Sequence, residues 1–295
     1  MRGPAPLSRR PSAHYAGGVT SGTSFGRVAA EYARGRPDYP ADAVAWMLEG
    51  VEGQVLDVGA GTGKLTIALL HQHHRVIAVD PDPVMLATLE IHAPGVMTVR
   101  GSAESLPFAD GSVAAVVMGQ AWHWVDVEAA SAEIARVLRP GGTLGMIWNI
   151  RDEYSPWVEA LTRIIGYSHA ERLLDGPGPR VGAPFGELEA YETTWKAEVT
   201  AAEVRALVHS RSTYFSARDE AAHDVDLALE QLFASIGLTG DATATMPYAT
   251  FAFRARTPGA SEDTADAAGA ADAADAADAA DASEDAAGAP APDDA

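Results

Sequence analysis

Residues 55–64 read Val-Leu-Asp-Val-Gly-Ala-Gly-Thr-Gly-Lys, and residues 76–80 read Val-Ile-Ala-Val-Asp. The first stretch is an apolar run typical of a buried strand, and it enters a glycine loop that opens a helix near residues 62–70. The second stretch is another buried-strand run, and it ends in an acid. This order predicts a nucleoside-binding half-unit of an α/β fold.

The glycine loop has a direct physical meaning. Glycine lacks Cβ, so Gly59, Gly61 and Gly63 can adopt positive φ and let a ligand lie against the backbone. The helix that follows presents free amide groups and the positive end of its dipole, which favour an anionic group. Asp80, at the end of the second predicted strand, can accept hydrogen bonds from both hydroxyls of a ribose.

Two other kinds of glycine loop resemble this one in part. A P-loop needs glycine at position 58 and serine or threonine at position 65, whereas this chain has Val58 and Leu65. The sequence therefore argues against a P-loop. A nicotinamide-binding Rossmann loop and a glycine turn that binds nothing both stay open from this motif alone.

The rest of the chain alternates predicted strands and helices. Further strands are expected at 95–100, 112–118, 144–149, 191–199 and 248–255. Helices are expected at 83–91, 126–138, 201–208 and 217–236. The predicted fold class is α/β, with a doubly wound, Rossmann-like, mostly parallel seven-stranded sheet and helical cap insertions.

Several motifs outside the glycine loop point to one family. They are Arg-Pro-Asp-Tyr-Pro at 36–40, Gly-Ser-Ala-Glu-Ser-Leu-Pro-Phe at 101–108, Gly-Gln-Ala-Trp-His-Trp at 119–124, Trp-Asn-Ile-Arg-Asp at 148–152 and Met-Pro-Tyr at 246–248. Together with the glycine loop, they resemble the class I S-adenosylmethionine (SAM) dependent methyltransferases of small-molecule type. Within that family, the chain is most similar to the trans-aconitate methyltransferase-like subgroup. The resemblance covers about residues 24–256.

The resemblance implies SAM as the cofactor and S-adenosylhomocysteine as its product. The residues that it assigns to cofactor binding are Tyr32, Arg36, Asp57, Gly59, Gly61, Gly63, Asp80, Pro81, Ala103, Glu104 and Gln120. Among these, Asp80 would bind the ribose, Asp57 would help to hold the methionine ammonium, and Tyr32 and Arg36 would close over the methionine carboxylate. Many relatives have Asp or Thr at position 102, where this chain has Ser102. The adenine contact is therefore expected from Ala103 and Glu104.

The methyl acceptor is expected beside the end of the fourth strand. Trp122 and Trp124 are predicted to line the substrate pocket, and His123 is predicted to act as a general base or as a pocket residue. The alternative is that His123 is a hydrogen-bonded packing residue and that both tryptophans belong to the core. Candidate partners for an anionic acceptor are Arg151, Arg205 and Arg211.

Composition limits the range of partners. The 295 residues include no cysteine and carry a formal net charge of −20. Residues 257–295 hold eleven acids and no Lys or Arg, and subtracting these from −20 leaves −9 for the rest. An acidic body argues against a nucleic acid as substrate. No apolar run approaches the length of a membrane span, and no secretory signal is present, so a cytoplasmic protein without membrane contact is expected.

The absence of cysteine excludes a disulfide framework and a Cys-based zinc site, and the histidines at 71–74 are interpreted as solvated, so no metal is expected. The oligomeric state is not predicted. Three segments are expected: a disordered N-terminal extension at 1–23, a methyltransferase domain at 24–256 and a disordered acidic Asp-Ala-Ala tail at 257–295. The cap segments of the domain are placed at about 25–50, 151–185 and 200–240.

The predicted function is transfer of a methyl group from SAM to a small molecule, either an organic acid or a metabolite that resembles a natural product. Two alternatives stay open at this point. One is an NAD(P)-dependent oxidoreductase on the same half-fold, and the other is a non-catalytic SAM-binding or interaction protein, because a fold does not by itself establish activity.

Overall fold

The computed structural model describes residues 35–211, 214 and 219–259. Several predicted features lie outside the described residues: Tyr32, the segment predicted to be disordered at 1–23, the start of the first cap segment, and residues 260–295 of the tail predicted to be disordered at 257–295. The chain divides into two units, with the boundary between Thr257 and Pro258.

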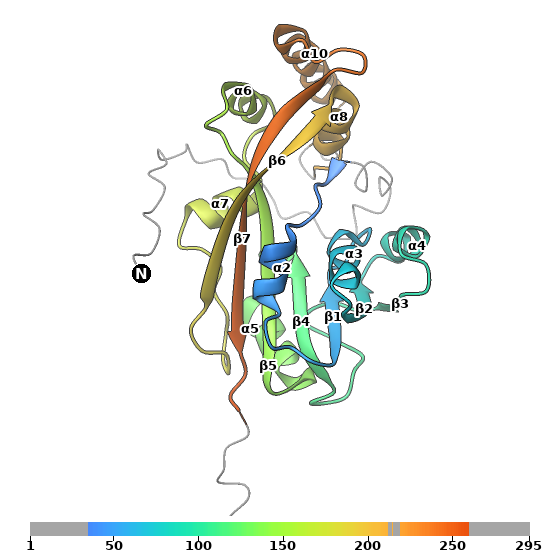
Figure 1. Cartoon of the computed structure of the whole chain (residues 1–295), viewed down its shortest axis with the longest axis vertical. Coiled ribbons are helices and arrows are strands. Elements are labelled where there is room, and N and C mark those ends of the chain that lie inside the picture. Colours follow the sequence, from blue (N-terminus) through green and yellow to red (C-terminus); the bar gives the residue numbers. More distant parts are fainter. Residues whose placement is uncertain (1–34, 212–213, 215–218, 260–295) are drawn as a thin grey trace, which may run out of the picture. The chain divides into compact units, whose positions relative to one another are not determined.

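The first unit is built on one seven-stranded sheet, as the sequence predicts (Figure 1). The strands lie in the order β3-β2-β1-β4-β5-β7-β6. Neighbouring strands from β3 to β5 pair in parallel, and β7 pairs antiparallel with both β5 and β6. The strands are β1 (Gln54–Val58), β2 (Arg75–Asp80), β3 (Met97–Arg100), β4 (Val113–Gly119), β5 (Leu138–Arg151), β6 (Glu189–Thr200) and β7 (Thr243–Arg256).

The burial of each strand follows its place in the sheet. β4 is buried along nearly its whole length because helices or loops cover both of its faces, and its sequence Val-Ala-Ala-Val-Val-Met-Gly is a continuous apolar run. β6 is an edge strand, and its residues alternate between partly buried and exposed. The two patterns explain why the sequence predicts one strand from its apolar run and the other from its alternation.

Helices cover both faces of the sheet (Figure 1). On one face, α2 (Ala41–Met47) and α3 (Lys64–His71) pack against β1, β4 and β5. α4 (Pro83–His92) packs against β2 and β3 next to α3. On the other face, α5 (Val127–Val137) contributes Ile134 and Val137 to the largest core cluster. This two-sided cover gives the doubly wound arrangement.

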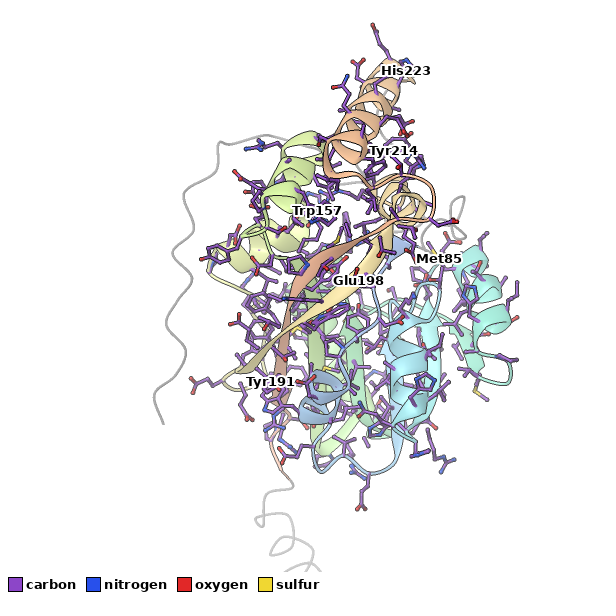
Figure 2. All side chains as sticks on the ribbon, turned by 45° about the horizontal axis from the view of Figure 1, so that its top comes forward. Met85, Trp157, Tyr191, Glu198, Tyr214 and His223 are labelled. Atoms are coloured by element: carbon purple, nitrogen blue, oxygen red, sulfur yellow. The ribbon has the colours of Figure 1, made fainter. Side chains whose placement is uncertain are left out.

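Four more helices form a cap at the edge of the sheet where the parallel strands end. They are α6 (Pro156–Ile165), α7 (His169–Asp175), α8 (Ala201–His209) and α10 (Asp219–Ile236). Leu161 of α6, Val204 of α8 and Phe233 of α10 belong to one buried cluster with Tyr248 of β7. Figure 2 shows Trp157 and Tyr214 within this part of the molecule. Within the described part of the chain, no helix is long and apolar enough to cross a bilayer.

Candidate active site

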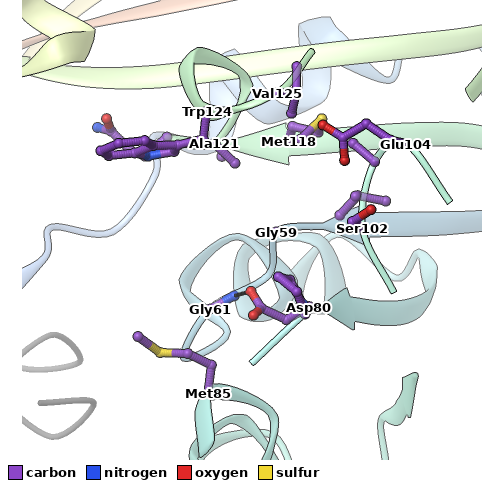
Figure 3. Close-up of a pocket in the computed structure, with 15 residues that line it drawn as sticks. Gly59, Gly61, Asp80, Met85, Ser102, Glu104, Met118, Ala121, Trp124 and Val125 are labelled. Carbon is purple, nitrogen blue, oxygen red and sulfur yellow. Dashed lines mark hydrogen bonds between the residues drawn. The ribbon is translucent and has the colours of Figure 1, made fainter. Parts of the chain in front are cut away.

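The carboxyl ends of β1, β2 and β4 meet around one cavity, which we call the glycine-loop cavity (Figure 3). This is the edge at which open α/β sheets bind ligands. The residues that line it are Val58, Gly59, Gly61, Asp80, Pro81, Met85, Ser102, Ala103, Glu104, Met118, Gly119, Gln120, Ala121, Trp124 and Val125. Predicted cofactor residues from four separate segments of the sequence therefore lie around one space.

The loop between β1 and α3 needs glycine at two positions for different reasons. Gly59 has φ 71°, and a Cβ added there would lie 2.8 Å from the Ala121 Cβ. Gly63 has φ 94°, and a Cβ there would meet the side chain of Leu89 at 2.8 Å. Gly59 therefore faces the cavity, whereas Gly63 allows α3 to pack close to α4. The helix begins at Lys64, two residues later than predicted, because the glycine loop continues through residue 63.

Asp80 at the end of β2 is fixed by backbone amides. Its Oδ2 accepts a hydrogen bond from Gly61 N at 2.9 Å, and its Oδ1 accepts one from Asp82 N at 2.9 Å. Burial raises the pKa of this carboxyl, and the two amide hydrogen bonds oppose that shift. Each carboxylate oxygen still has a second lone pair for a ligand hydroxyl. Figure 3 shows Asp80 beside Gly61, with Ala121 and Trp124 across the cavity.

A second space lies on the other side of the glycine loop, and we call it the Asp57 cavity. Its lining residues are Arg36, Pro37, Tyr39, Asp57, Gly59, Ala60, Thr62, Lys64, Leu65, Gly119, Gln120 and Asn149. The Asp57 side chain is fully buried, and its Oδ2 accepts a hydrogen bond from Thr66 Oγ1 at 2.6 Å. Its Oδ1 is buried and accepts no hydrogen bond from the residues that the structure describes.

The electrostatics of Asp57 follow from this burial. Burial, together with the nearby Asp80 carboxylate, raises the pKa of Asp57 to about 7, although the hydrogen bond from Thr66 opposes the shift. A buried carboxylate with one oxygen lacking a partner is a binding position for a cation or a hydrogen-bond donor.

A third space, the arginine cavity, lies between the end of β5 and α7. Its lining residues are Arg36, Gln120, His123, Trp124, Asn149, Ile150, Arg151, Tyr167, Ser168, His169, Ala170, Glu171, Arg172 and Arg211. Four of these residues are arginines, and one is an acid. The cavity therefore has an excess of positive charge, although the chain as a whole is acidic.

Glu171 joins two of the buried arginines. It accepts a hydrogen bond from Arg151 Nη2 at 2.7 Å, and its other oxygen lies 3.8 Å from Arg211 Nη1. Burial opposes ionisation of Glu171, but Arg151 and Arg211 hold its pKa at about 2. Burial and the neighbouring Arg151 lower the pKa of Arg211 to about 9. One carboxylate thus balances two cations that are each only 6% exposed.

The two arginines also retain unused donors. The Nε atoms of Arg151 and Arg211 are buried and have no hydrogen-bond partner among residues 35–211, 214 and 219–259. Buried N–H groups are normally paired, so an anion in this cavity would satisfy donors that the chain itself leaves unpaired.

Gln120 connects the three cavities, since it lines all of them. Its φ is 55°, a left-handed value that is uncommon for a residue other than glycine. The backbone N donates to Ile147 O at 2.9 Å, and Nε2 donates to Asn149 O at 2.9 Å. β5 therefore holds the turn after β4 in a strained conformation at the junction of the cavities.

His123 lies in the short 3₁₀ helix Trp122–Trp124 and lines the arginine cavity. Its Nδ1 accepts a hydrogen bond from Trp148 Nε1 on β5 at 3.3 Å. Burial, together with the positive charges of His169 and Arg36, lowers the pKa of His123 to about 3. The ring is therefore neutral at physiological pH.

Comparison with known proteins assigns this site to a family. A methyltransferase domain model matches residues 56–146. An uncharacterised methyltransferase of Mycobacterium tuberculosis is 45% identical over 193 residues, which cover 64% of this chain and 76% of that protein. The chain belongs to the class I SAM-dependent methyltransferases.

Two further similarities agree with this family. An uncharacterised methyltransferase-like protein of Schizosaccharomyces pombe is 32% identical over 228 residues, covering 72% of this chain and 87% of that protein. The solved structure of a type II methyltransferase of Anaeromyxobacter dehalogenans is similar in fold, with a TM-score of 0.57 at 23% identity, covering 76% of this chain and 99% of that one. Membership in this family decides against the oxidoreductase and the non-catalytic alternatives.

The cavities of this methyltransferase fit SAM. The unpartnered Oδ1 of Asp57 suits the ammonium of the methionine part, and Arg36 and Lys64 in the same cavity suit its carboxylate. On the other side of the loop, the approach of Gly59 to Ala121 leaves no room for a side chain at position 59. The space beside Asp80 is consequently bordered by bare backbone, as close binding of a ribose requires.

Several predicted site residues lie elsewhere. Trp122 is only 2% exposed, belongs to the core and donates from Nε1 to Arg180 O, so its assignment to the substrate pocket is corrected. Trp122 belongs to the same buried cluster as Ile134 and Val137 of α5. Arg205 pairs with Glu230 and lies over the Phe233 ring, outside the arginine cavity. Tyr32 lies outside the described residues.

Other lining residues have no clear signal in the sequence. Met85 and Val125 are apolar residues that nothing in the sequence distinguishes from core residues. His169 and Arg172 lie in a segment whose sequence matches no helix, strand or site motif clearly. Asn149 is different, because it ends the core of a predicted strand at the ligand edge. Its position could have marked it as a site residue.

Proposed function

We propose that this methyltransferase transfers a methyl group from SAM to a small organic acid bound in the arginine cavity. The supporting observation is the excess of buried arginine in that cavity, together with the unpaired Nε atoms of Arg151 and Arg211. A carboxylate would pair with these donors through strong charge-assisted hydrogen bonds. A cationic acceptor would be repelled by the arginines, and a neutral acceptor would leave their excess positive charge unbalanced.

The cofactor would occupy the two cavities on either side of the glycine loop. Asp80 would accept hydrogen bonds from the ribose, with Pro81, Ala103 and Glu104 lining the adenine side. Asp57 would hold the ammonium, and Arg36 would hold the carboxylate of the methionine part. When bound, SAM supplies a methyl group from a positively charged sulfonium, and the sulfur becomes a neutral thioether once the methyl group is transferred.

The residues of this chain would act mainly by position. Gln120 and Trp124 border both the glycine-loop cavity and the arginine cavity, so they lie where an acceptor and the methyl group would meet. Holding two reactants in line can by itself supply a large part of the rate enhancement. A carboxylate is ionised at neutral pH, so its oxygen is ready to attack without loss of a proton.

The test is a turnover assay for S-adenosylhomocysteine with a panel of small acids, each paired with its own amide. We expect the acids to be methylated and the matched amides to be inert. Arg172→Gln, on the exposed side of the arginine cavity, should raise KM for the acid several-fold. Arg163→Gln is the control, because Arg163 pairs with Glu159 on the surface of α6. Turnover of amines or phenols alone, insensitive to Arg172→Gln, would contradict the proposal.

A further inference from the structure

The contact between Trp148 and His123 restricts where His123 can carry its proton. Trp148 is fully buried on β5, and its indole N–H can only donate a hydrogen bond. The atom that it faces is Nδ1 of His123, at 3.3 Å. Since two N–H groups cannot bond to each other, Nδ1 must be the unprotonated nitrogen.

The surroundings also prevent the ring from gaining a second proton. His169 of α7 lies with its ring centroid 6.4 Å from that of His123, and Arg36 adds a positive charge. The other titratable or charged groups that line the same cavity are Arg151, Tyr167, Glu171, Arg172 and Arg211. Glu171, the only acid among them, is paired with arginine. A protonated His123 would therefore lie in a cavity that already has excess positive charge.

These two restrictions leave one form of the ring, neutral with its proton on Nε2. Among the described residues, Nε2 has no hydrogen-bond partner of its own. It is thus the nitrogen left to the cavity that the ring lines. A nitrogen in this form can donate a hydrogen bond but has no lone pair with which to take a proton.

We propose that Trp148 fixes His123 as a hydrogen-bond donor to the methyl acceptor, so that His123 orients the acceptor and does not deprotonate it. The inference rests on the proposed function, because it concerns the same acceptor. One carboxylate oxygen accepts from His123 Nε2, and the other forms the new bond to the methyl carbon as the bond from that carbon to sulfur breaks. The products are a neutral ester and a neutral thioether, and no proton moves. Trp148 is then a positioning residue that acts through His123.

The first test reads the proton position directly. Multiple-bond ¹H–¹⁵N spectra of the full chain with labelled histidine would report the tautomer of each of the nine histidines. The His123 signal is assigned by its loss in His123→Gln. We expect the Nε2–H pattern, unchanged from pH 5 to pH 8, and we expect Trp148→Phe to release the ring into a mixture of tautomers.

The outcome that overturns the proposal is a His123 signal with the Nδ1–H pattern or one that titrates near pH 6.5. If Trp148→Phe does not fold, the wild-type spectrum and the His123→Gln assignment still give the answer. Since no acceptor is needed, this test can fail while the methyltransferase assay succeeds, and the reverse also holds.

The second test uses whichever acid the turnover panel identifies. A glutamine amide can replace Nε2–H as a donor but cannot act as a base. We therefore expect His123→Gln to keep kcat within about tenfold of wild type and His123→Leu to have a lower kcat than His123→Gln. The rate of the wild-type enzyme should be constant from pH 6 to 8. Loss of a general base would instead cost about 10²–10⁴-fold in both variants. That result would overturn the donor role.

Discussion

At the scale of single residues, Asp57 shows how a binding group can oppose stability. The carboxyl is fully buried beside Asp80, and one of its oxygens has no partner among the described residues. Its pKa is about 7 in the folded protein, against 3.8 for an unperturbed group. The folded state therefore favours the protonated form, and the stabilisation present below pH 4 is lost as the pH rises through 7.

Asp57→Asn should remove this dependence. Without cofactor, we expect the variant to be more stable than wild type at pH 8 by up to about 4 kcal/mol, the free energy that corresponds to the raised pKa of Asp57. At pH 4, we expect the variant and wild type to be similarly stable. SAM affinity should fall, because the amide cannot neutralise an ammonium. Urea unfolding at both pH values and calorimetry with SAM would measure these effects.

The control for this prediction is Asp241→Asn in an exposed turn, which should change neither quantity. Equal stability of Asp57→Asn and wild type at pH 8 would show that Asp57 is satisfied in the free protein. The ammonium site would then need a different residue.

At the scale of elements, α7 is attached to the sheet by charge as well as by apolar packing. Glu171 is in the first turn of α7, forms a capping box with Ser168 and pairs with Arg151 of β5. A buried acid between two arginines contributes little net stability when complete, but removing it leaves two uncompensated cations.

Glu171→Gln should therefore destabilise the protein strongly, by about 3–5 kcal/mol, and lower the melting temperature by many degrees. The matched control is Glu159→Gln on α6, where the exposed pair with Arg163 contributes about 0.5 kcal/mol or less. Thermal melts of both variants would test this. A small effect at position 171 would mean that water or a bound anion already balances the arginines.

At the scale of the whole molecule, Thr257 fixes the end of the first unit. Thr257 is buried, its N donates to Gly142 O at 2.9 Å and its Oγ1 donates to Arg139 O at 3.0 Å. The boundary between the two units follows it directly. These two hydrogen bonds anchor the end of β7 to the segment at residues 139–142.

Two truncations should separate this anchor from the acidic segment. A chain that ends at Gly259 should melt within about 1 °C of the full chain, because residues 260–295 include no aromatic residue and no aliphatic side chain larger than those of Ala and Pro. A chain that ends at Arg256 should melt a few degrees lower, since two hydrogen bonds of about 1 kcal/mol each are lost. Calorimetric scans would compare them. A large drop for the chain that ends at Gly259 would show that residues 260–295 stabilise the folded unit.

The sequence by itself determined the sheet, and it identified residues that line the glycine-loop cavity. Buried strands appear as apolar runs, and edge strands appear as alternation, because each pattern reports how many faces of a strand are covered. Gly59 was identifiable because it directly follows a predicted strand, and Asp80 because it is the acid that ends the next one; both positions lie at the ligand edge of such a sheet. The order of residues within each short segment was sufficient to predict the strands and the residues at their ends.

Only the tertiary structure defined the arginine cavity, in which we place the acceptor. Trp122 and Trp124 are two residues apart, yet one packs in the core and the other lines a cavity. The partner of His123 lies 25 residues away on β5, and Arg151 meets a glutamate 20 residues further along the chain. Local patterns report whether a side chain is covered, but not which distant group covers it. The charge and proton position of a buried group depend on that distant partner, so the chemistry of the acceptor pocket follows from the packing of α7 and the turn after β4 against β5.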